Sequence, residues 1–88
     1  MTSRTATIGA QTGLHARPAA LFVKAVSASG HAVQISANGK SANAASLLSV
    51  MSLGIAKGEQ VELEVTGADE ARIAEELATL LESDLDAE

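Results

Sequence analysis

The alternation of apolar and polar residues over positions 60–66 constrains the fold more than any other feature of this sequence. The aliphatic members are Val61, Leu63 and Val65, and all the residues beside them are polar. Because successive side chains of a β-strand point to opposite faces, the segment predicts a strand with one buried face and one face in water. A sheet built from such strands needs cover on one side only, which favours antiparallel pairing.

A hairpin is the next clear signal. Residues 32–37 alternate in the same way, and Asn38-Gly39 is the dipeptide preferred in a two-residue type I′ turn. We therefore expect antiparallel strands over 32–37 and 40–43. A weaker pattern predicts a first strand over 5–8.

Three other segments have helical spacing. Apolar residues recur at this spacing from about 16 to 28, and Gly30 follows as a helix stop. Ser46 and Gly54 suit the N-cap and the left-handed C-cap of a short second helix. Asp69 is the expected N-cap of a third helix, and the last few residues after that helix are expected to fray. The apolar face of the third helix consists of Ile73, Ala74, Leu77, Leu80 and Leu81.

The element order β-α-β-β-α-β-α predicts an α+β protein. Its expected form is a two-layer, open-faced sandwich in which three helices cover one face of a four-stranded antiparallel sheet. With 88 residues, the chain is expected to form one domain, residues 1–88. Phe22 is the only aromatic residue, so the core must be built from aliphatic side chains.

Charge divides the chain into two parts. All eleven acidic residues lie from Glu59 onwards, whereas residues 1–58 contain five basic residues and no acid. The net charge of −5 makes the chain a poor ligand for nucleic acid, whose binding depends on Lys and Arg neutralising phosphates. The acid-free part is nevertheless suited to a phosphate group or an acidic protein partner.

The residue types also limit which compartment and which cofactors are expected. With no cysteine, the chain has no disulfide or thiolate metal site, and we expect it to be cytoplasmic. Two histidines and acids that begin only at Glu59 predict no metal site, and no cofactor is expected. No apolar segment of a signal peptide follows Arg4, and the apolar run from Pro18 to Val23 is too short to span a bilayer. We expect no membrane insertion.

His15 is the strongest candidate for a functional residue. It stands just before the first expected helix, where backbone amides without intrahelical partners and the helix dipole attract anions. Since Pro18 has no N–H, the donors expected here are the amides of Ala16 and Arg17. A neutral imidazole supplies a nucleophilic lone pair, and the Arg17 guanidinium suits a phosphoryl group. The alternative is that His15 is only a helix cap beside a surface arginine.

Other candidates carry weaker signals. His31 precedes a strand and has no neighbouring carboxylate in the sequence, so it is expected to be an ordinary surface or strand-edge residue. Leu47 and Leu48 are adjacent and cannot both face one core at helical spacing. Either they pack in the core with Met51, or part of this cluster is an exposed docking patch.

Three sequence blocks resemble the HPr family, the histidine-containing phosphocarriers of the bacterial phosphoenolpyruvate-dependent sugar phosphotransferase system. They are residues 13–19 (GLHARPA), 38–40 (NGK) and 46–54 (SLLSVMSLG). The resemblance covers essentially the whole chain, from the first strand through the third helix. It implies the strand order 1-4-2-3 and a phosphoryl carrier, which is not an enzyme.

The resemblance also implies roles for individual residues. His15 would accept a phosphoryl group on Nδ1 from phosphorylated enzyme I and pass it to the enzyme IIA component of a sugar permease. Arg17 would be the companion of the phosphohistidine, and the protein is expected to be a monomer. Both partners would dock on the first two helices. The implied docking residues are Ala20, Lys24, Leu47, Leu48 and Met51.

Ser46 matches a serine that an ATP-dependent HPr kinase phosphorylates in many Gram-positive relatives, where the phosphate impairs docking to enzyme I. In this chain, Ala45 stands where those relatives often carry lysine, and Ser49 where they often carry glycine. Regulation at Ser46 therefore stays open. Two further hypotheses stand beside the sugar-system carrier: the same fold in a regulatory or nitrogen-related phosphorelay, and a plain interaction module in which His15 is a structural cap.

Overall fold

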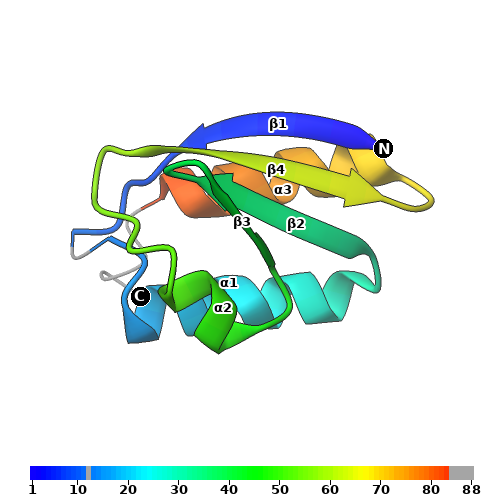
Figure 1. Ribbon diagram of the computed structural model, residues 1–88. Coiled ribbons are helices and arrows are strands. Elements are labelled where there is room, and N and C mark those ends of the chain that lie inside the picture. The colour runs from blue at the N-terminus through cyan, green and yellow to red at the C-terminus, as the bar shows by residue number, and fades with distance from the viewer. Residues whose placement is uncertain (12, 84–88) are drawn as a thin grey trace.

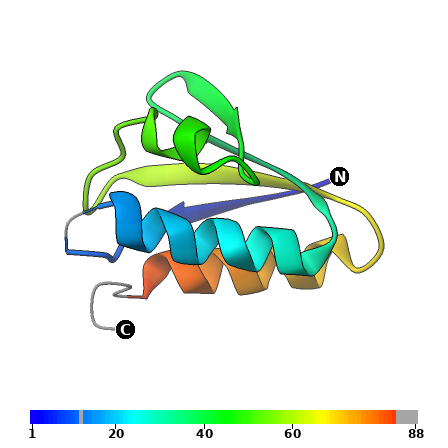
Figure 2. The ribbon, with the colours of Figure 1, turned by 90° about the horizontal axis from the view of Figure 1, so that it is seen from below.

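The computed structural model describes residues 1–11 and 13–83, which form two layers (Figure 1). The elements in chain order are β1 (Thr2–Thr7), α1 (Ala16–Ser29), β2 (Ala32–Ala37), β3 (Lys40–Asn43), α2 (Leu47–Met51), β4 (Gln60–Thr66) and α3 (Glu70–Glu82). The four strands form one antiparallel sheet in the order β1-β4-β2-β3. The helices lie on one face of that sheet, with α1 between α2 and α3 (Figure 2). This is the predicted open-faced α+β fold.

The core lies between the layers and is aliphatic except for one ring. The inward residues of β2 and β4 are buried, as the alternation predicts, and Phe22 of α1 has no exposed surface. Leu80, on the apolar face expected for the third helix, is only partly buried at the edge of the core, as is Val23 of α1. The opposite face of the sheet carries exposed polar residues such as Glu62. One-sided cover by helices is therefore enough to bury the apolar face.

The turn between β2 and β3 has the predicted backbone. Asn38 and Gly39 both have positive φ, at 55° and 76°. Positive φ at both central residues defines the type I′ turn, whose twist matches that of the strands on either side. The turn fixes the hairpin register, in which Ala37 pairs with Lys40.

The prediction for the first strand was wrong at both ends. β1 begins at Thr2 and ends at Thr7, because it pairs along β4 from Thr2↔Val65 to Thr7↔Gln60. Its first three residues are polar and none of them is buried, so periodicity within the segment did not reveal them. Ile8 lies beyond the strand, although its side chain is buried.

The second helix ends earlier than predicted. α2 stops at Met51, and Gly54 has the expected left-handed conformation but lies in the turn that follows. The amides of Leu53 and Gly54 donate to the carbonyls of Val50 and Met51, three residues back, at 3.2 Å each. This tighter bonding closes the helix before Gly54.

Asp69 precedes α3 as predicted, but it does not cap the helix with its side chain. It adopts a left-handed conformation with φ of 56°, and its carboxylate lies 3.7 Å from the Arg72 guanidinium. Glu70 accepts a hydrogen bond from the Gly67 N–H instead, at 3.1 Å. A carboxylate in the first turn thus organises the helix start.

The expected fraying falls on residues 84–88, which lie outside the described residues. Within the described chain, no helix has the length and apolar character needed to cross a membrane.

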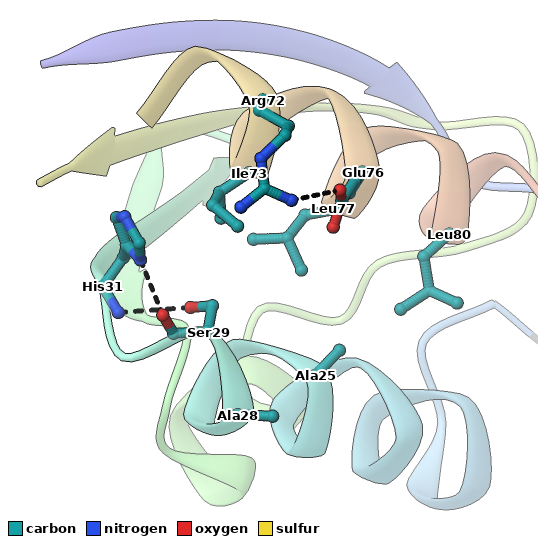
Figure 3. Close-up of a pocket in the computed structure, with 9 residues that line it drawn as sticks. All are labelled: Ala25, Ala28, Ser29, His31, Arg72, Ile73, Glu76, Leu77 and Leu80. Atoms are coloured by element: carbon teal, nitrogen blue, oxygen red, sulfur yellow. Dashed lines mark hydrogen bonds and ion pairs between the residues drawn. The ribbon is translucent and has the colours of Figure 1, made fainter. Parts of the chain in front are cut away.

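A groove of about 500 Å³ lies between α1 and α3, with His31 at one end (Figure 3). Its floor is largely apolar, and its rim carries Ser29, His31, Arg72 and Glu76. His31 is more than the ordinary surface residue expected from the sequence. Its Nδ1 contacts the Ser29 carbonyl at 2.7 Å and its Nε2 contacts the Ala68 carbonyl, so the ring links the α1–β2 turn to the β4–α3 turn.

Protonation strengthens this link. Both ring nitrogens of His31 face carbonyl oxygens, and only the imidazolium donates from both nitrogens at once. The Ala68 carbonyl, followed by that of Ser29, raises the pKa of His31 above its ordinary value of 6.5. Asp69 raises this pKa further, whereas partial desolvation and the Arg72 charge oppose the increase.

We predict that His31 makes stability depend on pH. Because its pKa is raised in the folded state, its contribution is complete below the ordinary value of 6.5 and is lost as pH rises through the folded-state pKa. Thermal melts of the wild type and His31→Gln from pH 5.5 to 8.5 measure this. The wild type should lose melting temperature relative to the variant as pH increases. A constant difference between the two would contradict the assignment.

Candidate functional site

The candidate site begins at the N-terminus of α1, where His15 is the N-cap. Its backbone is extended, with φ of −79° and ψ of −171°, and its carbonyl accepts the Ala19 N–H at 2.8 Å. The imidazole makes no capping hydrogen bond, and the first turn of the helix contains no acidic residue. The His15 side chain is therefore not committed to capping. Because no acidic residue lies in the first turn, the positive end of the helix dipole is not neutralised by a carboxylate of that turn.

Buried neighbours hold this exposed segment in place. His15, Ala16 and Arg17 are exposed, whereas Leu14 and Pro18 on either side are buried. The segment is thus anchored at both ends while its centre faces water. Ala16 and Arg17 are the first two residues of α1, in the helical turn whose N–H groups attract anions.

Contacts distant in sequence set the position of His15. The Leu14 N–H donates to the Ile55 carbonyl at 3.0 Å. Gly13 has φ of 74°, and a Cβ on it would lie 2.4 Å from that same carbonyl oxygen, so only glycine fits. His15 and Leu14 line a hollow of about 300 Å³ with Met51 and residues 54–56. The site therefore lies where two segments some 40 residues apart in the chain come together.

The sequence did not point to residues 54–56. Their contribution is a wall of backbone and small side chains beside His15, which leaves no chemical motif to recognise. The available signal was the pair Gly54 and Gly58, both of which adopt positive φ around this turn. Such glycines indicate a turn but not what the turn contacts.

The implied docking residues are exposed, as a docking patch requires. Ala20 and Lys24 lie four residues apart on α1 and so share a face of that helix. On α2, which packs against α1, Leu48 is 82% exposed and Leu47 and Met51 are each 37% exposed. Of the large hydrophobic side chains exposed in the described chain, only Met1 lies outside α2. The leucine cluster is thus not a core element.

Ser46 is the N-cap of α2, as predicted. Its side-chain oxygen accepts the Ser49 N–H at 3.4 Å, and its own N–H donates to the Asn43 carbonyl at 3.0 Å. It is partly buried and adjoins the exposed Leu47. A negative charge at Ser46 would thus meet the helix N-terminus on one side and the hydrophobic patch on the other.

No group of three or more His, Cys, Asp or Glu residues within 1–11 and 13–83 is arranged to hold a metal ion. The exposed residues His15, Ala16 and Arg17 offer an imidazole, a guanidinium and backbone amides.

Solved structures of HPr proteins are similar to this chain. The chain superposes on HPr from Thermoanaerobacter tengcongensis with a TM-score of 0.90 and 40% identity, covering 100% of this chain and 99% of that one. It matches the phosphocarrier protein HPr of Bacillus anthracis with a TM-score of 0.86 and 32% identity, covering 91% and 95%. The fold is that of the HPr phosphocarriers.

The family follows from the sequence match. The family described as "PTS HPr component phosphorylation site" matches residues 2–83. The chain therefore belongs to the HPr family, the phosphocarriers of the phosphotransferase system.

A third similar structure differs in assembly. Crh, the catabolite repression HPr of Bacillus subtilis, has a TM-score of 0.74 and 36% identity, covering 96% of this chain and 97% of its own. Its crystal structure is a swapped dimer. Proteins with this fold thus include at least one that associates by exchanging part of its structure.

We predict that Gly13→Ala destabilises the protein more than Gly39→Ala. The two glycines have nearly equal φ, 74° and 76°, but a Cβ meets the Ile55 carbonyl at Gly13 and nothing within 4 Å at Gly39. Left-handed strain costs each variant about 1 kcal/mol, and the clash should add roughly 1–3 kcal/mol at Gly13. Urea unfolding measures both, and equal losses would show that the close approach to Ile55 has no energetic weight.

Proposed function

We propose that this chain accepts a phosphoryl group on Nδ1 of His15 from phosphorylated enzyme I and donates it to enzyme IIA components that serve sugar uptake. Residues 1–88 would act as one cytoplasmic, monomeric domain. The observation that carries this proposal is the exposed imidazole of His15, which stands at a helix N-terminus and makes no capping bond. A side chain held in that place without a structural task is suited to chemistry.

The transfer requires little covalent machinery from the protein. The Nδ1 lone pair attacks phosphorus, the bond from phosphorus to the donor breaks, and the donor keeps that electron pair. Charge on the phosphoryl oxygens is met by the amides of Ala16 and Arg17 and by the Arg17 guanidinium. Positioning and charge stabilisation dominate phosphoryl transfer, so a small carrier suffices.

Docking would use the exposed faces of α1 and α2. Ala20 and Lys24 supply the α1 part of this surface, and Leu47, Leu48 and Met51 supply the α2 part. Met51 also lines the hollow beside His15, which makes the surface continuous with the acceptor. Residues 1–58 contain no acid, so an acidic partner meets no like charge there.

We predict that the wild type gains one acid-labile phosphoryl group when incubated with enzyme I and phosphoenolpyruvate, and that His15→Ala gains none. The variant should fold normally, because His15 is exposed and outside the core. Intact-mass measurement reads out the modification, and a thermal melt controls for folding. Phosphorylation of a folded His15→Ala protein would refute the assignment of the acceptor, and an unmodified wild type would refute the proposed function.

Charge at Ser46 is expected to weaken docking without harming the fold. An aspartate there can still accept from the amides of α2 and is favoured by the helix dipole, so Ser46→Asp should keep its stability or gain a few tenths of a kcal/mol. In the complex, the carboxylate beside Leu47 and Leu48 must lose water, which is expected to cost ~1–3 kcal/mol of binding.

Calorimetric titration of enzyme I with the wild type and with Ser46→Asp tests this prediction. Ser46→Ala is the matched control. The alanine variant loses the cap but adds no charge, so it should lose stability by about 1 kcal/mol and bind nearly as well as the wild type. Equal affinity of the aspartate variant would remove Ser46 from the docking surface. A lower melting temperature for Ser46→Asp would contradict the capping geometry.

A further inference from the structure

Glu59 is the first acidic residue of the chain, and its carboxylate folds back onto the turn that precedes it. Oε1 of Glu59 accepts the Ala56 N–H at 2.7 Å. The backbone N–H of Glu59 donates to the Ala56 carbonyl at 3.1 Å. The same two residues are therefore joined twice, once through the backbone and once through the side chain, and together these bonds close the turn over residues 56–59.

One side of this turn is fixed to the end of β1. The Gly58 N–H donates to the Ile8 carbonyl at 2.9 Å, and the Ile8 N–H donates to the Glu59 carbonyl at 3.0 Å. Ile8 is buried, so these bonds tie the turn to the core. Because this side is held, the hydrogen bond from the Ala56 N–H to the Glu59 carboxylate fixes the orientation of the other side of the turn.

The other side of the turn meets the phosphoryl acceptor segment. Ala56 and Ile55 line the hollow that His15 also lines. The Ile55 carbonyl, in the peptide that supplies the Ala56 N–H, accepts the Leu14 N–H at 3.0 Å. The peptide unit between Ile55 and Ala56 thus donates its N–H to Glu59. Its C=O accepts the N–H of Leu14, the residue before His15.

We propose that Glu59 is a positioning residue for His15, acting through the Ile55–Ala56 peptide and Leu14. The proposal rests on the function proposed above. The carboxylate restrains the peptide that orients the acceptor loop, and with it the imidazole relative to the helix amides. Because Ala56 is exposed, water can replace the missing acceptor when Glu59 is truncated, so the fold persists. Water does not restrain the peptide, however.

Two variants of Glu59 separate the hydrogen bond from the charge. Glu59→Ala removes the acceptor, whereas Glu59→Gln keeps a side-chain oxygen that can accept the Ala56 N–H without a charge. Glu62→Ala is the matched control, because Glu62 lies exposed on the outer face of β4 and its removal changes the net charge equally. Thermal melts establish that all three variants are folded.

Initial rates of phosphorylation by enzyme I and phosphoenolpyruvate, with this chain as the varied substrate, test the proposal. We expect kcat to fall about 3- to 30-fold in Glu59→Ala with KM changed less than about twofold, since misplacing a reacting group by ~1 Å costs up to a hundredfold in rate. Glu59→Gln and Glu62→Ala should stay within about twofold of the wild type. An unchanged Glu59→Ala, an equal loss in Glu59→Gln, or a loss confined to KM would each overturn the positioning role.

Nuclear magnetic resonance tests the structural link apart from the transfer reaction. In Glu59→Ala, the Leu14 amide should exchange with solvent faster and the imidazole resonances of His15 should shift, while Glu62→Ala leaves both unchanged. If Leu14 and His15 are unaffected by Glu59→Ala, the positioning role is wrong even where phosphorylation proceeds. If the wild type accepts no phosphoryl group but these signals move, the proposed function fails and the link from Glu59 to His15 stands.

Discussion

The aliphatic inner face of the sheet is the constraint on which the rest of the structure depends. Leu63 and Ile35, on the two central strands, have no exposed surface, and Phe22 of α1 lies in the same core. Each Å² of apolar surface removed from water contributes about 25 cal/mol, so α1 and α3 must cover this face. The chain therefore passes repeatedly between the layers. Two of these passages, before α1 and before β4, lie at the same end of the molecule (Figure 1). His15, the N-cap of α1, ends the first passage, and Leu14 beside it bonds to Ile55 of the second.

Much of this fold could be predicted because its signals are local. Alternation revealed β2 and β4, the Asn38-Gly39 dipeptide revealed the turn between β2 and β3, and helical spacing revealed α1 and α3. Two of the differences lie where a contact distant in sequence decides the structure. β1 is set by its pairing with β4 and not by its own polar residues, and the ring of His31 acts as a link only because the turn at Ala68 folds against it.

The same distinction holds for the candidate site: its local features could be predicted from the sequence, and its long-range contacts could not. A histidine before a helix that contains Pro18 could be placed at the positive helix end from sequence alone, because the physics of helix ends is local. The side of the His15 hollow formed by residues 54–56 could not be predicted, because Ile55 and Ala56 act through backbone groups that every residue carries. A sequence shows which side chains can react, but the close approach of Gly13 to Ile55 that positions them exists only in the folded chain.

The distribution of charge complements this geometry. The eleven acids from Glu59 onwards give the chain its net charge of −5, and β4 and α3 carry six of them, whereas α1 and α2 contain none. α3 lies on the far side of α1 from α2 (Figure 2), so the exposed Leu48 sits on the acid-free side of the helical layer. Net charge away from zero opposes self-association, while a local surface without acids permits approach of an acidic partner. The acidic residues and the exposed hydrophobic patch of α2 thus lie in different parts of one small domain.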